Sequence, residues 1–264
     1  MSFWNSLTIG RYIPSNSPVH RLDPRTKIIS ILIISISIFL LKNLWGYFLL
    51  AVFLLGVALL AKLSIKLVLR GLVPLLWIIV FTFLLHLFFT PGSPIASLGP
   101  LRITEQGLSL GTFIALRLIF LILVTSLLTL TTSPQKLTKG LEFLLAPLRV
   151  VGISSHKIAM MMTLSLRFVP LLFEEIDRLI NAQKSRGSDL SSKNPIKRIR
   201  AIIPILISLL ANLFRRADEF ALAMETRAYD PDRPRRDPEA TKFSTFDLLT
   251  ILIIITLSTT LIIL

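Results

Sequence analysis

The chain has 264 residues, of which 53% are hydrophobic and 17% are charged, and its mean hydropathy is +0.74. Soluble domains average about 45–50% apolar and about 25% charged residues, so this composition excludes an ordinary soluble domain and indicates a membrane protein. The formal net charge of +14 is then typical of cytoplasmic loops and of contact with anionic lipid headgroups, rather than of nucleic-acid binding.

Five apolar stretches are predicted to cross the membrane, since a helical span needs about 20 mostly apolar residues. They cover approximately Ile28–Leu41, Leu44–Ala61, Leu72–Phe89, Leu108–Leu130 and Leu248–Leu264. Lys27 and Lys42 flank the short first stretch, and we expect both side chains to snorkel to the membrane surfaces. The first residues do not resemble a cleavable signal peptide, so the first span is expected to remain as an anchor.

The distribution of Lys and Arg over the loops predicts the orientation. The loops before the first span and between the second and third carry seven of these residues: Arg11, Arg21, Arg25, Lys27, Lys62, Lys66 and Arg70. The alternate loops hold only Lys42 and Arg102. The positive-inside rule therefore predicts a cytoplasmic N-terminus, an external irregular loop at Pro91–Gln106 and a cytoplasmic segment at Ser133–Lys242.

The segment 133–242 is too charged to span a membrane, yet its apolar residues recur at three- and four-residue steps. This pattern predicts an amphipathic helix over Ser155–Arg186, ended by a left-handed cap at Gly187. A second helix is predicted from an Asn194 cap to about Arg227. A shorter amphipathic piece between Ser133 and Val151 is expected to lie at the membrane surface.

The two predicted helices end alike. Five residue types recur at a constant offset of 41 positions: Phe173 and Phe214, Asp177 and Asp218, Ala182 and Ala223, Arg186 and Arg227, Asp189 and Asp230. Small residues flank each arginine, in the triplets Ser185-Arg186-Gly187 and Thr226-Arg227-Ala228. A chain that presents the same helix end twice is expected to bind two similar partners. A lone arginine at a helix C-terminus, in contrast, is ordinarily a charge that the helix dipole favours.

These triplets and the segment Leu22-Asp23-Pro24-Arg25-Thr26-Lys27 resemble motifs of the transmembrane T components (EcfT/CbiQ-like) of energy-coupling factor (ECF) transporters. The resemblance covers nearly the whole chain. Those transporters import vitamins and transition-metal ions. In that family each of two long cytoplasmic helices usually ends in Ala-Arg-Gly. Ala228 stands where glycine is usual, so we expect the second helix to end in a different cap or to continue slightly.

The resemblance implies an all-α integral membrane protein with about five transmembrane helices and a cytoplasmic coupling domain of two long amphipathic helices. The implied regions are a cytoplasmic N-terminal segment (1–27), a four-span membrane region (28–132), the coupling domain (133–242) and a C-terminal transmembrane helix (243–264). The implied location is a bacterial cell membrane, with several passes.

The resemblance also implies the partners. Each of two ABC-type ATPase subunits would bind one helix end, one at Ser185, Arg186 and Gly187 and the other at Thr226, Arg227 and Ala228. The unequal triplets favour an ATPase heterodimer. A membrane-embedded substrate-binding S component would contact the helix pair at Met160, Met161, Met162, Phe168 and Leu172, and the flexible Met side chains suit a surface that re-packs. The Met run is equally consistent with plain packing.

Several charged or polar residues allow other interpretations. Basic clusters are expected to contact lipid headgroups rather than nucleic acid: Lys193, Lys197, Arg198 and Arg200, then Arg233, Arg235 and Arg236. Arg117 lies deep within a predicted span, where a tie to a neighbouring helix or snorkelling is favoured over contact with substrate. His86 is favoured as a hydrogen-bonded helix residue over a metal ligand.

The sequence shows no catalytic constellation. It lacks a phosphate-binding loop, a nucleophile elbow and a zinc motif, which argues against an enzyme and against ATP binding by this chain. The resemblance implies that ATP hydrolysis takes place on partner subunits. Cysteine is absent and the three histidines lie far apart, so neither a metal site nor a cofactor is predicted. The alternative function is a self-sufficient carrier or channel, which would need polar or broken helices at mid-membrane.

Overall fold

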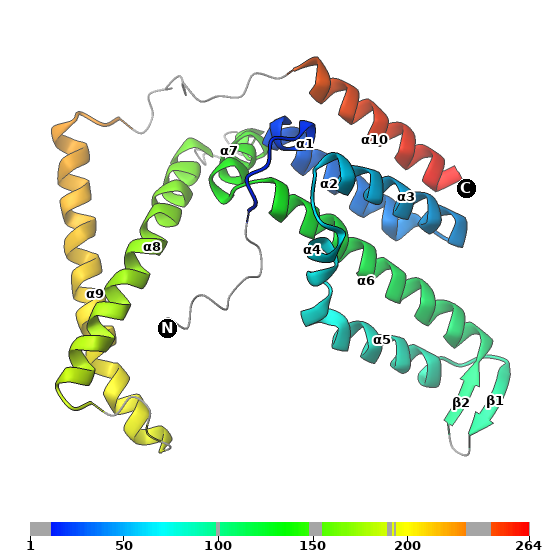
Figure 1. Ribbon diagram of the computed structural model, residues 1–264, viewed down its shortest axis with the longest axis horizontal. Helices are drawn as coiled ribbons and strands as arrows, with labels where there is room; N and C mark the ends of the chain where they lie inside the picture. The colour runs from blue at the N-terminus through cyan, green and yellow to red at the C-terminus, as the bar shows by residue number, and fades with distance from the viewer. Residues whose placement is uncertain are drawn as a thin grey trace. The chain divides into compact units, whose positions relative to one another are not determined.

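The computed structural model describes residues 12–98, 101–147, 155–188, 192, 194–230 and 244–263. The helices are α1 (Pro18–Arg21), α2 (Pro24–Leu40), α3 (Leu44–Leu60), α4 (Ile65–Arg70), the 3-10 turn η2 (Val73–Leu75), α5 (Leu76–Phe89), α6 (Glu105–Thr131), α7 (Pro134–Leu144), α8 (Ser155–Ser185), α9 (Pro195–Thr226) and α10 (Thr245–Ile263). Inter-residue contacts divide the chain into two units: Met1–Leu144 with Glu239–Leu264, and Leu145–Pro238. Figure 1 shows these elements.

The first unit is a bundle of apolar helices. Three helical segments are long and apolar enough to cross a membrane: Ile65–Phe89, Glu105–Thr131 and Thr245–Ile263. α2 and α3 have 17 residues each, and α3 is also apolar. The all-α membrane fold predicted from the sequence is therefore confirmed.

The bundle core forms where α2 contacts α6, α7 and α10 and where α3 also packs on α6. Its most buried side chains are apolar residues of these helices: Ile38, Leu41, Leu50, Val124 and Leu261. Gly140 of α7 lies so close to α2 that an added Cβ would meet the Ile28 side chain at 2.7 Å. The apolar side chains on the outer faces, such as Leu55 and Val80, stay exposed, as expected for helices surrounded by lipid.

The loop between α5 and α6 was expected to be irregular, and this prediction is wrong. Residues Pro94–Leu98 (β1) and Leu101–Thr104 (β2) pair as an antiparallel hairpin. Gly99 and Pro100, which were part of this prediction, lie outside the described residues. At the base of the hairpin, the Thr104 hydroxyl donates to the Thr90 carbonyl at 2.8 Å and accepts from the Gly107 N–H at 3.1 Å. One side chain thus caps α6 and fixes both ends of the loop.

Lys27 does not snorkel as expected, whereas Lys42 is exposed. The Lys27 side chain is only 7% exposed, and its Nζ donates to the Thr131 carbonyl at 3.0 Å and to Thr132 Oγ1 at 3.2 Å. The last carbonyls of α6 have no helical donors and carry the negative end of the helix dipole. A buried ammonium group therefore satisfies the end of α6.

The second unit is the helix pair α8 and α9, which confirms the two predicted amphipathic helices. The Asn194 side chain caps α9 by accepting from the Ile196 N–H at 3.0 Å. The helices run antiparallel, since Phe168 meets Phe220 edge-to-face at 4.9 Å between ring centroids and Glu175 meets Asn212. Several residues named in the sequence analysis lie outside the described residues: Arg11, Asp189, Lys193, Arg233, Arg235 and Arg236.

Candidate functional site

The end of α8 is a complete Schellman cap, which is the arrangement that Gly187 predicts. The Ser188 N–H donates to the Gln183 carbonyl at 3.0 Å, and the Gly187 N–H donates to the Lys184 carbonyl at 3.0 Å. Gly187 has φ of +83°, the left-handed conformation that glycine adopts without steric cost. Arg186 is therefore the last residue before the chain reverses direction.

The end of α9 repeats this cap, with every residue shifted by 41 positions. The Tyr229 N–H donates to the Met224 carbonyl at 2.9 Å, and the Ala228 N–H donates to the Glu225 carbonyl at 2.9 Å. Ala228 has φ of +48°, so it adopts the left-handed conformation despite its Cβ. The expectation of a different cap or a longer helix is therefore wrong, and Arg227 takes the position that Arg186 has on α8.

Both arginines are solvent-exposed, as are the residues on either side of them. Neither guanidinium forms an ion pair or a hydrogen bond within the part of the chain that the structure describes. A guanidinium group offers five N–H donors in a rigid fork, which suits carboxylates and carbonyls at a protein interface. Each helix end thus presents an exposed guanidinium group, without a partner in the described chain, next to a backbone turn that the cap fixes.

The two caps lie at opposite ends of the helix pair. The Tyr229 hydroxyl reaches Met160 Sδ at 2.6 Å, which places the end of α9 beside the start of α8. Arg186 lies at the other end of α8, and the rise of 1.5 Å per residue separates Met160 from Arg186 by roughly 39 Å. This separation allows two globular partners to bind one helix pair.

Polar contacts at the crossing of α8 and α9 hold the pair together. Asn212 donates to Glu175 Oε1 at 2.8 Å and accepts from Arg215 Nη2 at 2.8 Å, while Arg216 Nη2 lies 4.0 Å from Glu175 Oε2. Glu175 is half-buried and links the two helices. Aromatic packing of Phe168 on Phe220 continues the same contact.

The structure separates the residues expected to face an S component. Met161 and Met162 are 61% and 38% exposed on α8. Phe168 and Leu172, in contrast, line a small pocket between the helices together with Leu209 and Leu213 of α9, and Met160 contacts Tyr229. Met161 and Met162 are therefore the exposed members of this set, whereas the other three side chains are half-buried.

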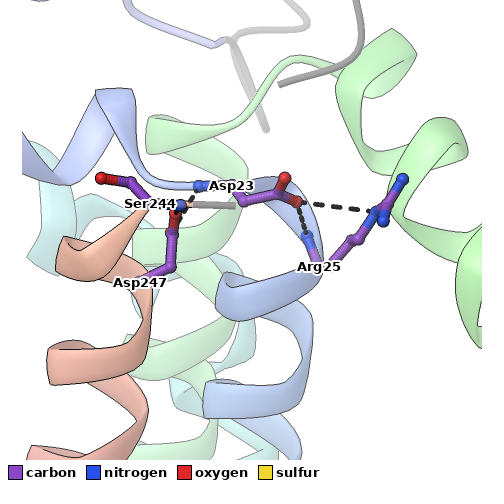
Figure 2. Close-up of polar contacts among 4 residues, drawn as sticks. All are labelled: Asp23, Arg25, Ser244 and Asp247. Carbon is purple, nitrogen blue, oxygen red and sulfur yellow. Dashed lines mark hydrogen bonds and ion pairs between the residues drawn. The ribbon is translucent and has the colours of Figure 1, made fainter. Parts of the chain in front are cut away.

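A polar cluster of the membrane unit was missed by the sequence reasoning (Figure 2). Asp247 is 2% exposed, and its Oδ2 accepts from the Ser244 N–H at 2.9 Å at the start of α10. Its Oδ1 accepts from the Asp23 N–H at 2.9 Å, and the Asp23 side chain in turn caps α2 by accepting from the Arg25 N–H at 2.8 Å. The Ser-x-x-Asp spacing of a capping box was the available signal. One carboxylate thus joins the beginnings of α2 and α10.

Lys27 lies near this cluster. Burial, and to a smaller extent the positive charge of Lys136, lower the pKa of its ammonium group to about 8, while Asp247 and Asp23 oppose the shift. Arg25 also stacks on the Phe143 ring of α7 at 4.5 Å. The cluster therefore connects α2, α6, α7 and α10 at one end of the bundle.

The two polar residues singled out within the spans form helix contacts. Arg117 Nη2 donates to the Leu41 carbonyl at 3.3 Å, which ties α6 to the end of α2. His86 Nδ1 bonds to the Thr82 carbonyl of its own helix at 2.9 Å. In the described ranges, no group of three or more His, Cys, Asp or Glu side chains could hold a metal ion.

Comparison with known proteins identifies the family. The sequence profile of the CbiQ family, described as "Cobalt transport protein", matches residues 15–238. The chain is 49% identical over 242 residues to the "Energy-coupling factor transporter transmembrane protein EcfT" of Thermosediminibacter oceani, covering 92% of this chain and 91% of that protein. It is 46% identical over 226 residues to the protein of the same name from Bacillus subtilis, covering 85% of each. The chain therefore belongs to the CbiQ family and is a transmembrane component of ECF transporters, a transport subunit rather than an enzyme.

Proposed function

We propose that this chain is the energy-coupling subunit of an ECF importer in a bacterial cell membrane. Two ABC-type ATPase subunits bind its helix ends on the cytoplasmic side, where the chain also has its N-terminus. A separate membrane-embedded S component binds the substrate, a vitamin or a metal ion. The chain itself binds neither nucleotide nor substrate.

The observation that carries this proposal is the repetition of one helix end. The caps at Gly187 and Ala228 share their hydrogen bonds, their left-handed residue and their exposed arginine. An alanine in the left-handed conformation costs about 1–2 kcal/mol, so the second cap is maintained at an energetic cost. Two similar receptors, such as the two subunits of an ATPase dimer, account for this repetition. The differing triplets favour two different ATPases.

The antiparallel contact between α8 and α9 supports transmission of motion. When ATP binding draws the two ATPases together, the bound helix ends follow, and the crossing at Glu175 and Asn212 couples one helix to the other. Exposed apolar side chains would then re-pack against the S component. They include Met161, Met162, Ile199, Ile203 and Leu206.

Charge reversal at both caps tests the proposal. In the complete complex, Arg186→Glu together with Arg227→Glu should abolish co-purification of the ATPases, because carboxylates would replace both guanidinium forks. Arg167→Glu is the matched control, since Arg167 is also exposed on α8 but lies away from both caps. Undiminished ATPase recovery with the double variant would contradict the docking role.

A further inference from the structure

The side chain of Tyr229 joins the two long helices at a distance from the place where they cross. Its hydroxyl reaches Met160 Sδ at 2.6 Å. α8 and α9 cross each other (Figure 1), and Phe168 packs on Phe220 at the crossing. Met160 lies eight residues before Phe168, which is about 12 Å along the axis of α8. The helices are therefore joined at two separate places, the crossing and the Tyr229–Met160 contact.

The Tyr229–Met160 contact fixes the angle between α8 and α9. A crossing alone is a pivot about which two helices can rotate, whereas a further contact away from the pivot holds one angle. The Tyr229 N–H donates to the Met224 carbonyl at 2.9 Å as part of the cap, so Tyr229 is held on the same turn as Arg227. Tyr229 thus fixes the second cap relative to the start of α8.

The first cap has a different residue at this position. Ser188 takes the place of Tyr229, 41 positions earlier, and its hydroxyl donates to Gln183 Oε1 of α8 itself at 3.2 Å. Between residues 176–188 and residues 194–211, no hydrogen bond or ion pair joins the two helices. In these ranges, the end of the pair that carries Arg186 therefore lacks a polar bridge like that of Tyr229.

Movement of the two caps toward each other would open the Tyr229–Met160 contact. Arg186 follows α8 and Arg227 follows α9, so the caps lie on different helices and on opposite sides of the crossing. When the caps approach, the angle between these two helix ends narrows. Because each helix continues through the crossing, the angle between the start of α8 and the end of α9 widens by the same amount. The approach therefore pulls Tyr229 away from Met160.

The Tyr229–Met160 contact is also weaker than the crossing. A thioether sulfur is a weak acceptor for the Tyr229 hydroxyl, and the Met160 side chain is flexible. At the crossing, the Glu175 carboxylate accepts from Asn212 at 2.8 Å, and a hydrogen bond to an ionised group is about twice as strong as a neutral one. The crossing thus stays in place as the pivot while the weaker contact opens.

We propose that Tyr229 is a positioning residue for energy coupling. Its contact with Met160 holds α8 and α9 at the resting angle, and the contact opens when ATP draws the two caps together. This inference rests on the proposed function, because it needs an ATPase at each cap. It adds the residue that sets the resting state, and it makes the two ends of the helix pair unequal.

Distances between spin labels in the assembled complex test this role. The native chain has no cysteine, so Met161→Cys and Glu225→Cys, both at exposed positions, place one label on each side of the contact. ATP with vanadate should lengthen the distance between the labels. With Tyr229→Ala the long distance should already be present without nucleotide, whereas Ser188→Ala, the matched change on the first cap, should behave like the native chain. A distance that nucleotide leaves unchanged would overturn the proposal.

A covalent link between the same residues tests the contact in the opposite direction. Met160→Cys with Tyr229→Cys, joined by a short bismaleimide in a complex whose other subunits lack reactive cysteines, should hold the resting angle and lower ATP hydrolysis. Tyr229→Ala should raise ATP hydrolysis, and Tyr229→Phe, which removes only the hydroxyl, keeps this arm available if the alanine variant does not fold. Full ATP hydrolysis by the linked complex would overturn the proposal.

Retention of the ATPases separates this inference from the proposed function. Tyr229→Ala should keep both ATPases bound, and their loss would assign Tyr229 to docking and overturn its positioning role. If the Arg186→Glu and Arg227→Glu double variant kept its ATPases, the proposed function itself would fail. An unchanged label distance in a complex whose docking depends on both arginines would overturn the role of Tyr229 alone.

Discussion

The polar cluster around Asp247 and the two arginine caps both lie at helix ends, but they differ in burial and in whether their polar groups have partners within the chain. Asp247 is buried and gives each oxygen to a backbone N–H, one from Ser244 and one from Asp23. Arg186 and Arg227 also lie at helix ends, yet they are exposed and have no partner in the described chain. A helix end whose polar groups are satisfied internally stabilises the fold, whereas one that is built twice and left unsatisfied is available for binding.

The largest effect on stability is expected at the buried side of this comparison. Asp247→Ala would leave the buried N–H of Asp23 without an acceptor and would remove the acceptor of the exposed Ser244 N–H, and should lower the free energy of unfolding by about 1–3 kcal/mol. Denaturant unfolding in detergent measures this change. Asp247→Asn keeps one acceptor oxygen and should lose less. If Asp247→Ala unfolded like the native chain, the cluster would not hold α10 on α2.

Lys27 gives the cluster a pH dependence. Its folded-state pKa of about 8 lies below the ordinary value of 10.5, so between these pH values the unfolded chain binds a proton that the folded chain has released. The contribution of Lys27 to the free energy of unfolding therefore increases as the pH rises from about 8 to 10.5.

Melting temperatures of the native chain and of Lys27→Gln over this pH range measure that contribution as a difference. The native chain should gain stability relative to the variant with rising pH, while Lys66→Gln, which changes an exposed lysine, should track the native chain. A constant difference between the native chain and Lys27→Gln would show that Lys27 does not titrate in this range.

Substitutions at the left-handed residue of each cap should change the free energy of unfolding with opposite signs. Ala228→Gly relieves a left-handed alanine and should stabilise the helix pair by about 1 kcal/mol, whereas Gly187→Ala introduces the same conformation and should destabilise it by about 1 kcal/mol. Chemical unfolding of the two variants, alone and combined, checks this symmetry. Equal signs for both changes would mean that the two helix ends are not equivalent.

The smallest stability effect is expected at the arginines. Arg186→Lys and Arg227→Lys should each change the free energy of unfolding by less than about 0.5 kcal/mol, because the exposed guanidinium groups contact nothing in the described chain. Their effect should be seen in ATPase retention, since an ammonium group lacks the planar fork. A large loss of stability would assign the arginines to the fold instead.

Periodicity and local capping rules predicted much of the helix pair. The amphipathic pattern gave α8 and α9, Asn194 gave the start of α9, and Gly187 gave the first cap. The second cap was predicted incorrectly because the residue preference at Ala228 opposes the conformation that it adopts. Propensity alone cannot show that surrounding hydrogen bonds outweigh that preference.

Contacts between distant segments could not be derived in the same way. Asp23 and Asp247 are 224 residues apart, and no spacing rule joins them, although the local capping box at Ser244 was visible. Lys27 was expected at the membrane surface because flanking lysines usually snorkel, but the end of α6 provides it with acceptors. The β1–β2 hairpin was missed because each strand is only four or five residues long.

Site-specific photocrosslinking in the assembled complex tests the central claim most directly. A benzophenone side chain at Lys184 or at Glu225 would occupy the same exposed position two residues before the arginine in each cap. Both positions should crosslink to an ATPase subunit, while the same probe at Arg167 should not. Crosslinks from either cap to lipid or to this chain itself, with none to an ATPase, would contradict the account.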